Sequence, residues 1–177
     1  MTVVYSTRLA DGRIYIASDA AVEYGGGYRQ LMEEGKWWDY DGFFVGESGS
    51  DFALSRIRAK FEAKNAEPTA ALLAACVREV ASEVSKREHT EDLEAQLLYA
   101  APDEIAVVGG DGGILRRRVE ACVGHGETIL SSYLADRLPV PSKRTYKNVS
   151  RVVLAGLKFT ALKCTSVCEP YFEDVTE

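Results

Sequence analysis

The sequence predicts an α+β fold of four layers, in which two antiparallel β-sheets lie face to face and a pair of helices covers each outer face. Two observations lead to this prediction. Segments with strand-like alternation fall into two groups, and each group is followed by two segments with helical spacing. Segregated runs of strands and helices favour layered α+β architectures. No internal repeat or linker is evident, so residues 1–177 are expected to form one domain.

The first group of strands opens the chain. Residues 2–18 alternate around Asp11-Gly12, a dipeptide typical of hairpin turns. A loop with three consecutive glycines follows, and Asp41-Gly42 marks a later turn. Further strands are predicted over residues 28–32, 36–40 and 43–46.

The first pair of helices follows, because the apolar period changes. Leu54, Ile57 and Phe61 are spaced as on one helix face. A second helix is expected to open at Pro68, since proline is favoured in a first helical turn. Its apolar face comprises Leu73, Val77, Val80 and Val84.

The second half repeats this order. The expected strands cover residues 93–100, 104–109, 114–119 and 121–123. One helix is expected after Gly124-His125-Gly126 and another over residues 147–162, since prolines at 139 and 141 separate them. The tail over residues 164–175 is expected to hold a last strand.

Composition excludes several functional classes. The net charge of −6 argues against nucleic acid as the main partner. Arg116-Arg117-Arg118 is the only compact basic run and is expected to face solvent. No apolar stretch is long enough to cross a bilayer, and the N-terminus alternates as a strand does, so neither a membrane partner nor a signal peptide is expected.

The four cysteines suggest an intracellular protein. A zinc site on Cys164 and Cys168 would need two further ligands, and the chain has only two histidines. Reduced thiols in a cytoplasmic protein are the favoured interpretation. No metal or other cofactor is expected.

Thr2 is the candidate nucleophile. A small residue after Met1 allows removal of the initiator methionine, which would leave Thr2 with both a hydroxyl and a free α-amine that can act as its base. The return strand brings Asp19 back toward Thr2, and Lys36 follows a turn into a strand that can lie beside it. The alternative is an ordinary threonine at the start of a strand.

These residues form a recognisable pattern. Thr2 with Ala17-Ser18-Asp19, Lys36 and the run 45–51 before a helix resembles the proteasome β-subunit and HslV-like peptidase family, which belongs to the N-terminal nucleophile (Ntn) hydrolases. Residues 103–112 and 123–126 also match that pattern. The resemblance implies the Ntn-hydrolase form of the αββα sandwich.

The resemblance also implies roles for individual residues. Thr2 would be the nucleophile, Lys36 would lower the pKa of its hydroxyl and amine, and Asp19 would hold Lys36 in place. Gly49 would supply the backbone N–H of an oxyanion hole, as expected where a strand meets a helix. Otherwise Lys36 and Asp19 are surface charges.

Two further positions are expected to matter. His125 stands where the family usually has serine, so it either takes over that hydrogen-bonding role or merely caps the next helix. Glu47, with Ser48 beside it, would line the pocket for the substrate side chain that precedes the cut, and a carboxylate there would favour lysine or arginine. Alternatively, Glu47 contacts a neighbouring subunit or solvent.

The predicted function is that of a threonine-type peptidase subunit in a ring-shaped, self-compartmentalising protease. The resemblance implies a homo-oligomeric ring or stacked rings, peptides or unfolded proteins as substrates, and, by analogy, an unfoldase ATPase as partner. Two alternatives remain open: an inactive ring or scaffold homologue that retains Met1, and an Ntn amidohydrolase that acts on small amides.

Overall fold

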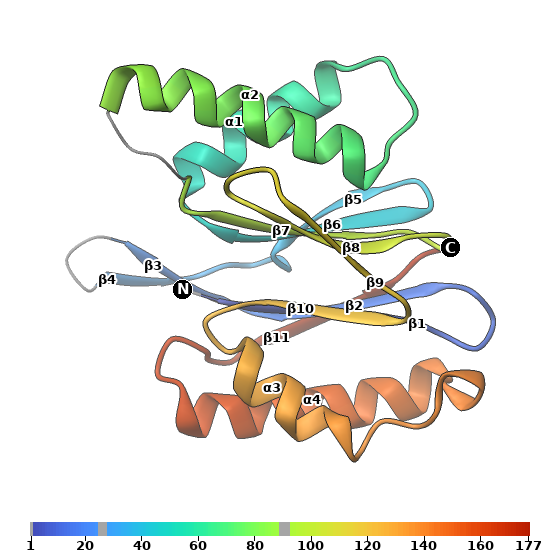
Figure 1. Ribbon diagram of the computed structural model, residues 1–177. Helices are drawn as coiled ribbons and strands as arrows, with labels where there is room; N and C mark the ends of the chain where they lie inside the picture. Colours follow the sequence, from blue (N-terminus) through green and yellow to red (C-terminus); the bar gives the residue numbers. More distant parts are fainter. Residues whose placement is uncertain (1, 25–27, 89–92) are drawn as a thin grey trace.

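Two stacked β-sheets lie between two layers of helices (Figure 1). The computed structural model describes residues 2–24, 28–88 and 93–177. One layer holds α1 (Asp51–Ala63) and α2 (Ala70–Glu88). The other holds α3 (Glu127–Ala135), the short 3-10 helix η1 (Pro141–Lys143) and α4 (Tyr146–Lys163). This order of layers confirms the predicted αββα sandwich.

Both main sheets are antiparallel. The sheet beside α1 and α2 has the strand order β5-β6-β7-β8-β9, and the sheet beside α3 and α4 has the order β10-β1-β2-β11. Strands β3 and β4 form a separate two-stranded sheet. The strands are β1 Val3–Arg8, β2 Ile14–Asp19, β3 Ala21–Tyr24, β4 Tyr28–Leu31, β5 Trp37–Tyr40, β6 Phe43–Gly49, β7 Ala95–Ala100, β8 Ile105–Gly109, β9 Ile114–Arg117, β10 Glu120–Gly124 and β11 Tyr171–Val175.

The predicted elements are present, but some of their ends differ. Strand β3 lies where a loop was expected, and the three glycines of that loop lie outside the described residues. The prediction that α2 opens at Pro68 is wrong by two residues. The helix begins after Thr69, whose Oγ1 accepts the Leu72 N–H at 3.1 Å, and the Pro68 carbonyl instead accepts a hydrogen bond from the Tyr99 hydroxyl at 2.9 Å.

Three apolar clusters hold the layers together. One lies between α1, α2 and the five-stranded sheet, and a second between α3, α4 and the four-stranded sheet. The third lies between the two sheets and includes Val4, Ile16, Phe44 and Leu98. The sheets approach closely at Gly46, where an added Cβ would lie 2.7 Å from the Val4 side chain. The end of β6 is therefore held over the start of β1.

The surface agrees with one expectation from the sequence. Residues 116–118 are exposed at and just beyond the end of β9, so the basic run faces solvent. No helix in the described ranges is both long and apolar enough to span a membrane.

The inter-sheet cluster can be tested with a matched pair of leucines. Leu98→Ala removes a fully buried side chain and is expected to lower the free energy of unfolding by about 2–5 kcal/mol. Leu162→Ala, at a side chain 81% exposed, should change it by less than about 0.5 kcal/mol. Urea denaturation measures both values, and equal effects would contradict the assignment of Leu98 to the core.

Candidate active site

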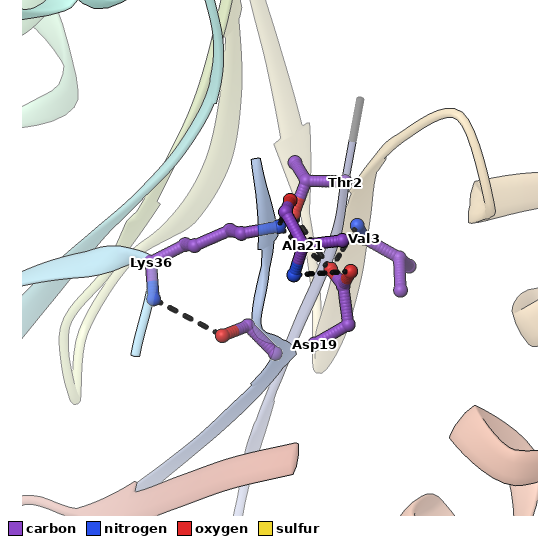
Figure 2. Close-up of polar contacts among 6 residues, drawn as sticks. Thr2, Val3, Asp19, Ala21 and Lys36 are labelled. Atoms are coloured by element: carbon purple, nitrogen blue, oxygen red, sulfur yellow. Dashed lines mark hydrogen bonds and ion pairs between the residues drawn. The ribbon is translucent and has the colours of Figure 1, made fainter. Parts of the chain in front are cut away.

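The side chains of Thr2, Asp19 and Lys36 meet in one cluster (Figure 2). Thr2 precedes β1, Asp19 ends β2 and Lys36 precedes β5. The Thr2 hydroxyl donates to Asp19 Oδ1 at 2.7 Å, Lys36 Nζ donates to the same oxygen at 3.0 Å, and Lys36 Nζ also donates to Thr2 Oγ1. The three residues that the sequence singled out therefore contact one another directly.

The fold explains why these residues meet. Strands β1 and β2 pair with Val4 opposite Ser18, so the end of β2 lies beside the start of β1. Lys36 comes from the other sheet, and its backbone N–H donates to Ser18 Oγ at 3.0 Å. Its carbonyl accepts the Glu47 N–H at 2.9 Å, which fixes Lys36 against β6. Both sheets thus contribute to the cluster.

The Asp19 carboxylate is fully buried and fully engaged. Besides the Thr2 hydroxyl and Lys36 Nζ, it accepts the backbone N–H groups of Val3 at 3.0 Å and Ala21 at 3.1 Å. Lys36 is only 4% exposed, and its third hydrogen bond goes to the Ala21 carbonyl. Burial lowers the pKa of the Lys36 ammonium, and the Asp19 charge opposes this shift. The carboxylate therefore compensates a buried cation beside the Thr2 hydroxyl.

A cleft of about 570 Å³ opens above this cluster. Thr2 and Lys36 line it together with β4, the end of β6 and the first turns of α1. The remaining lining residues are Ala21, Gln30, Leu31, Met32, Glu33, Trp38, Glu47, Ser48, Gly49, Asp51, Leu54, Ser55 and Arg58. Thr2 and Lys36 thus form part of the wall of this cleft.

Gly49 ends β6 within the cleft lining. Its φ is +141°, and an added Cβ would lie 2.1 Å from the Glu94 carbonyl oxygen, so a side chain is excluded. The Ser50 N–H donates to that carbonyl, on the β7 side, whereas the Glu47 N–H donates toward β5. Along an antiparallel strand, the backbone N–H groups of successive residues point to opposite sides. The Gly49 N–H therefore points to the same side as the Glu47 N–H, away from β7.

Ser48 and Glu47 also line the cleft, and both are half-buried. Glu47 Oε2 accepts a hydrogen bond from Trp38 Nε1 at 2.5 Å. Burial raises the pKa of the Glu47 carboxyl, while the Trp38 hydrogen bond and the charge of Arg58 oppose the shift. Among the described residues Glu47 forms no ion pair, and the Arg58 guanidinium pairs instead with Glu62 at 2.9 Å.

His125 is placed differently from the other candidates. Its side chain is exposed in the turn between β10 and α3, and it is not among the residues that line the cleft. The backbone of its neighbours approaches Thr2 instead: the Gly126 N–H donates to the Thr2 carbonyl at 3.5 Å, and Gly124 packs against the same carbonyl. The turn therefore contacts Thr2 through its main chain.

Solved structures share this fold over nearly the whole chain. BPH from Thiobacillus denitrificans in complex with epoxomicin matches with a TM-score of 0.76 at 20% identity, covering 99% of this chain and 98% of that chain. Eukaryotic HslV from Trypanosoma brucei matches with a TM-score of 0.74 at 18% identity, covering 99% of each chain. The fold is that of the HslV- and proteasome-like Ntn hydrolases.

A third solved structure also shares the fold. The Anbu complex from Pseudomonas aeruginosa, solved as a helical assembly, matches with a TM-score of 0.77 at 16% identity, covering 99% of this chain and 81% of that chain. No family model matches the sequence, and no curated protein sequence matches it. The comparisons thus confirm the resemblance at the level of the fold.

Sequence reasoning missed three contributors to the site. Ser18 and Ala21 hold Lys36 through a hydroxyl and a backbone carbonyl, and Trp38 orients Glu47. Ser18 could have been suspected, since it is next to Asp19. A backbone carbonyl leaves no signal in a sequence, and Trp38 is indistinguishable there from a core tryptophan.

No group of three or more metal-binding side chains occurs among residues 2–24, 28–88 and 93–177. All four cysteines are free thiols, with Cys76 and Cys122 buried and the other two half-buried.

The compensation of Lys36 by Asp19 predicts a pH-dependent stability. Asp19→Asn leaves a buried ammonium without its counter-charge and is expected to lower the free energy of unfolding by about 3 kcal/mol or more at neutral pH. The folded-state pKa of Lys36 lies below 10.5 and should fall further in this variant. The difference in the free energy of unfolding between the wild type and the variant should therefore be largest below the pKa of Lys36 in the variant. It should shrink as the pH rises toward 10.5.

Urea denaturation at about pH 7 and about pH 9 measures this trend. Asp136→Asn, at an exposed carboxylate, is the matched control and should show no such convergence with the wild type. A deficit that stays constant or grows with pH would contradict the role assigned to Asp19.

Proposed function

We propose that this chain is a threonine-type peptidase subunit, formed by one domain over residues 1–177, with Thr2 as its N-terminal nucleophile. The observation that carries the proposal is the Thr2 hydroxyl between a buried ammonium and a buried carboxylate at the base of an open cleft. A structural core does not require such a cluster, because burying two charges is costly. Their placement against a hydroxyl favours a catalytic role.

The proposed reaction begins once Met1, which lies outside the described residues, has been removed. The Thr2 hydroxyl exchanges its hydrogen bond to Asp19 for one to its own α-amine, which takes the proton as Oγ1 attacks the peptide carbonyl carbon. The Lys36 charge stabilises the developing negative charge on Oγ1. The C–N bond then breaks, the leaving amine takes the proton, and water hydrolyses the remaining ester.

Gly49 is proposed as the oxyanion donor, with Ser48 beside it as a substrate contact. The direction of the Gly49 N–H away from β7 and its place in the cleft lining support this role. The exposed side chain of His125 argues against a part in proton transfer. His125 does not cap the next helix either, because the N-cap of α3 is Gly126 and no side chain donates or accepts a capping hydrogen bond there.

Glu47 is proposed to select substrates with lysine or arginine before the cut. A half-buried carboxylate without an ion-pair partner is unfavourable, so a cationic substrate side chain would supply that partner. Arg58 does not compete for it directly, because it is engaged by Glu62 and lies over the Trp38 ring at 5.7 Å. The apolar walls of Trp38 and Leu54 suit the aliphatic stem of such a side chain.

We further propose that the subunits form a homo-oligomeric ring or stacked rings in the cytoplasm and cleave peptides or unfolded proteins. The helical assembly described for Pseudomonas aeruginosa Anbu supports head-to-tail association within this fold. An unfoldase ATPase as partner is proposed by analogy alone.

Replacement of the nucleophile tests the mechanism. Thr2→Ala is expected to lower kcat for fluorogenic peptides by about 10⁴-fold or more, because no covalent step can occur. Thr2→Ser, the matched control, retains a hydroxyl and should keep measurable turnover. Mass spectrometry after treatment with epoxomicin should find Met1 absent and an adduct on Thr2. A full-length, unreactive protein would instead support the inactive scaffold, and cleavage of small amides alone would support the amidohydrolase.

Glu47→Gln tests the substrate preference. The variant is expected to lose about 10- to 100-fold in kcat/KM for peptides cleaved after arginine, because a charge-assisted hydrogen bond is lost, and to change little for peptides cleaved after leucine. Asp51→Asn, at another carboxylate of the same cleft, should change either value by less than about threefold. If the wild type cleaves as well after leucine or tyrosine as after arginine, the assigned preference is wrong.

A further inference from the structure

The two edges of the five-stranded sheet carry opposite charge. The strand order places β5 at one edge and β9 at the other. Acidic side chains lie at the β5 edge. At the β9 edge, three consecutive arginines lie at and just after the end of the strand. Edge strands expose unpaired backbone groups and are natural docking sites. The two edges are therefore complementary in charge.

The acidic flank is a cleft of about 400 Å³ between β5 and β11. It is lined by Glu34, Gly35, Trp37, Asp39, Arg58, Phe172, Glu173 and Asp174. In the part of the chain that the structure describes, neither Asp39 nor Asp174 has a cation within ion-pair distance, and Arg58 pairs with Glu62. Burial raises the pKa of Asp39, and the charges of Asp174 and Glu177 raise it further. Negative charge at this flank is thus uncompensated.

The basic flank comprises Leu115, Arg116, Arg117 and Arg118. Leu115 lies on β9 and is 52% exposed. Arg116 pairs with Glu104 at 2.8 Å. Arg117 and Arg118 are exposed and have no ion-pair partner among the described residues. This flank presents an apolar side chain flanked by positive charge.

The same face of the sheet carries both features. Leu115 lies opposite Val107 and Arg117 opposite Ile105, two residues of the inter-sheet cluster. At the other edge, Asp39 lies opposite Phe44 of that cluster, and Trp37 packs against it. Directly opposed residues share a face, so Leu115, Arg117, Trp37 and Asp39 all lie on the side that faces the second sheet.

We propose that the basic flank of one copy docks into the acidic flank of the next copy. Leu115 would contact the apolar lining of the cleft, Trp37 and Phe172, while Arg117 and Arg118 approach Asp39 and Asp174 of the neighbour. A second copy of this chain is favoured as the binding partner, because each chain carries both the basic flank and the acidic flank, on opposite edges of one sheet. Such a heterologous contact repeats, and it closes into a ring or continues as a helix. The inference rests on the proposed homo-oligomeric assembly.

Charge reversal with rescue tests this interface. Arg117→Glu with Arg118→Glu should raise the concentration for half-assembly at least about tenfold, and so should Asp39→Lys with Asp174→Lys. All four substitutions in one chain should restore assembly. Analytical ultracentrifugation measures the mass of the assembly, which is compared with the 19.4 kDa of one chain. Circular dichroism checks that each variant is folded. If a reversal variant does not fold, Arg117→Gln with Arg118→Gln replaces it.

Lys158→Glu with Lys163→Glu is the matched control for the basic-flank variant, because it lowers the net charge by the same amount at exposed positions of α4. This control should assemble as the wild type does. Unchanged assembly in both flank variants, absence of rescue, or equal loss in the control would each overturn the interface. A wild type that stays monomeric would overturn the assembly as well, whereas the epoxomicin adduct on Thr2 tests the catalytic proposal independently.

Discussion

The buried contact between Lys36 and Asp19 is the interaction on which the rest of the site depends. An ammonium that is 4% exposed is unfavourable without a counter-charge, and the carboxylate that supplies it is fully buried. Two backbone N–H groups and the Thr2 hydroxyl complete the coordination of Asp19. This network leaves the Thr2 oxygen between a cation and an anion, so the hydroxyl is held in one place and its proton has a defined direction.

The stacked sheets make this contact possible. Asp19 and Thr2 belong to one sheet, whereas Lys36 leads into the edge strand of the other. Close approach of the sheets at Gly46 and the hydrogen bond from the Lys36 N–H to Ser18 bring the two halves together. The apolar clusters therefore serve the site indirectly, because they fix the relative position of the sheets from which its residues come.

The same geometry accounts for the cleft. Strand β6 passes over β1 and ends at Gly49, where α1 begins, so the cleft is bounded by a strand end and a helix start. Glu47 lies on that strand end and is oriented by Trp38 of the neighbouring strand. Nucleophile, oxyanion donor and specificity residue are thus proposed on elements that the sandwich holds rigidly, which favours precise positioning of a substrate.

Strand and helix periodicity and turn dipeptides predicted the αββα sandwich and its antiparallel sheets, and the resemblance to a known family then supported the grouping of Thr2, Asp19 and Lys36. These signals are local, and each depends on neighbours along the chain. Strand β3, the start of α2 and the exposed position of His125 were not predictable, because pairing partners and capping contacts decide them. Likewise, the roles of Ser18, Ala21 and Trp38, and the opposite charges on the two sheet edges, were decided only by tertiary structure, since distant segments create them when the sheets pack.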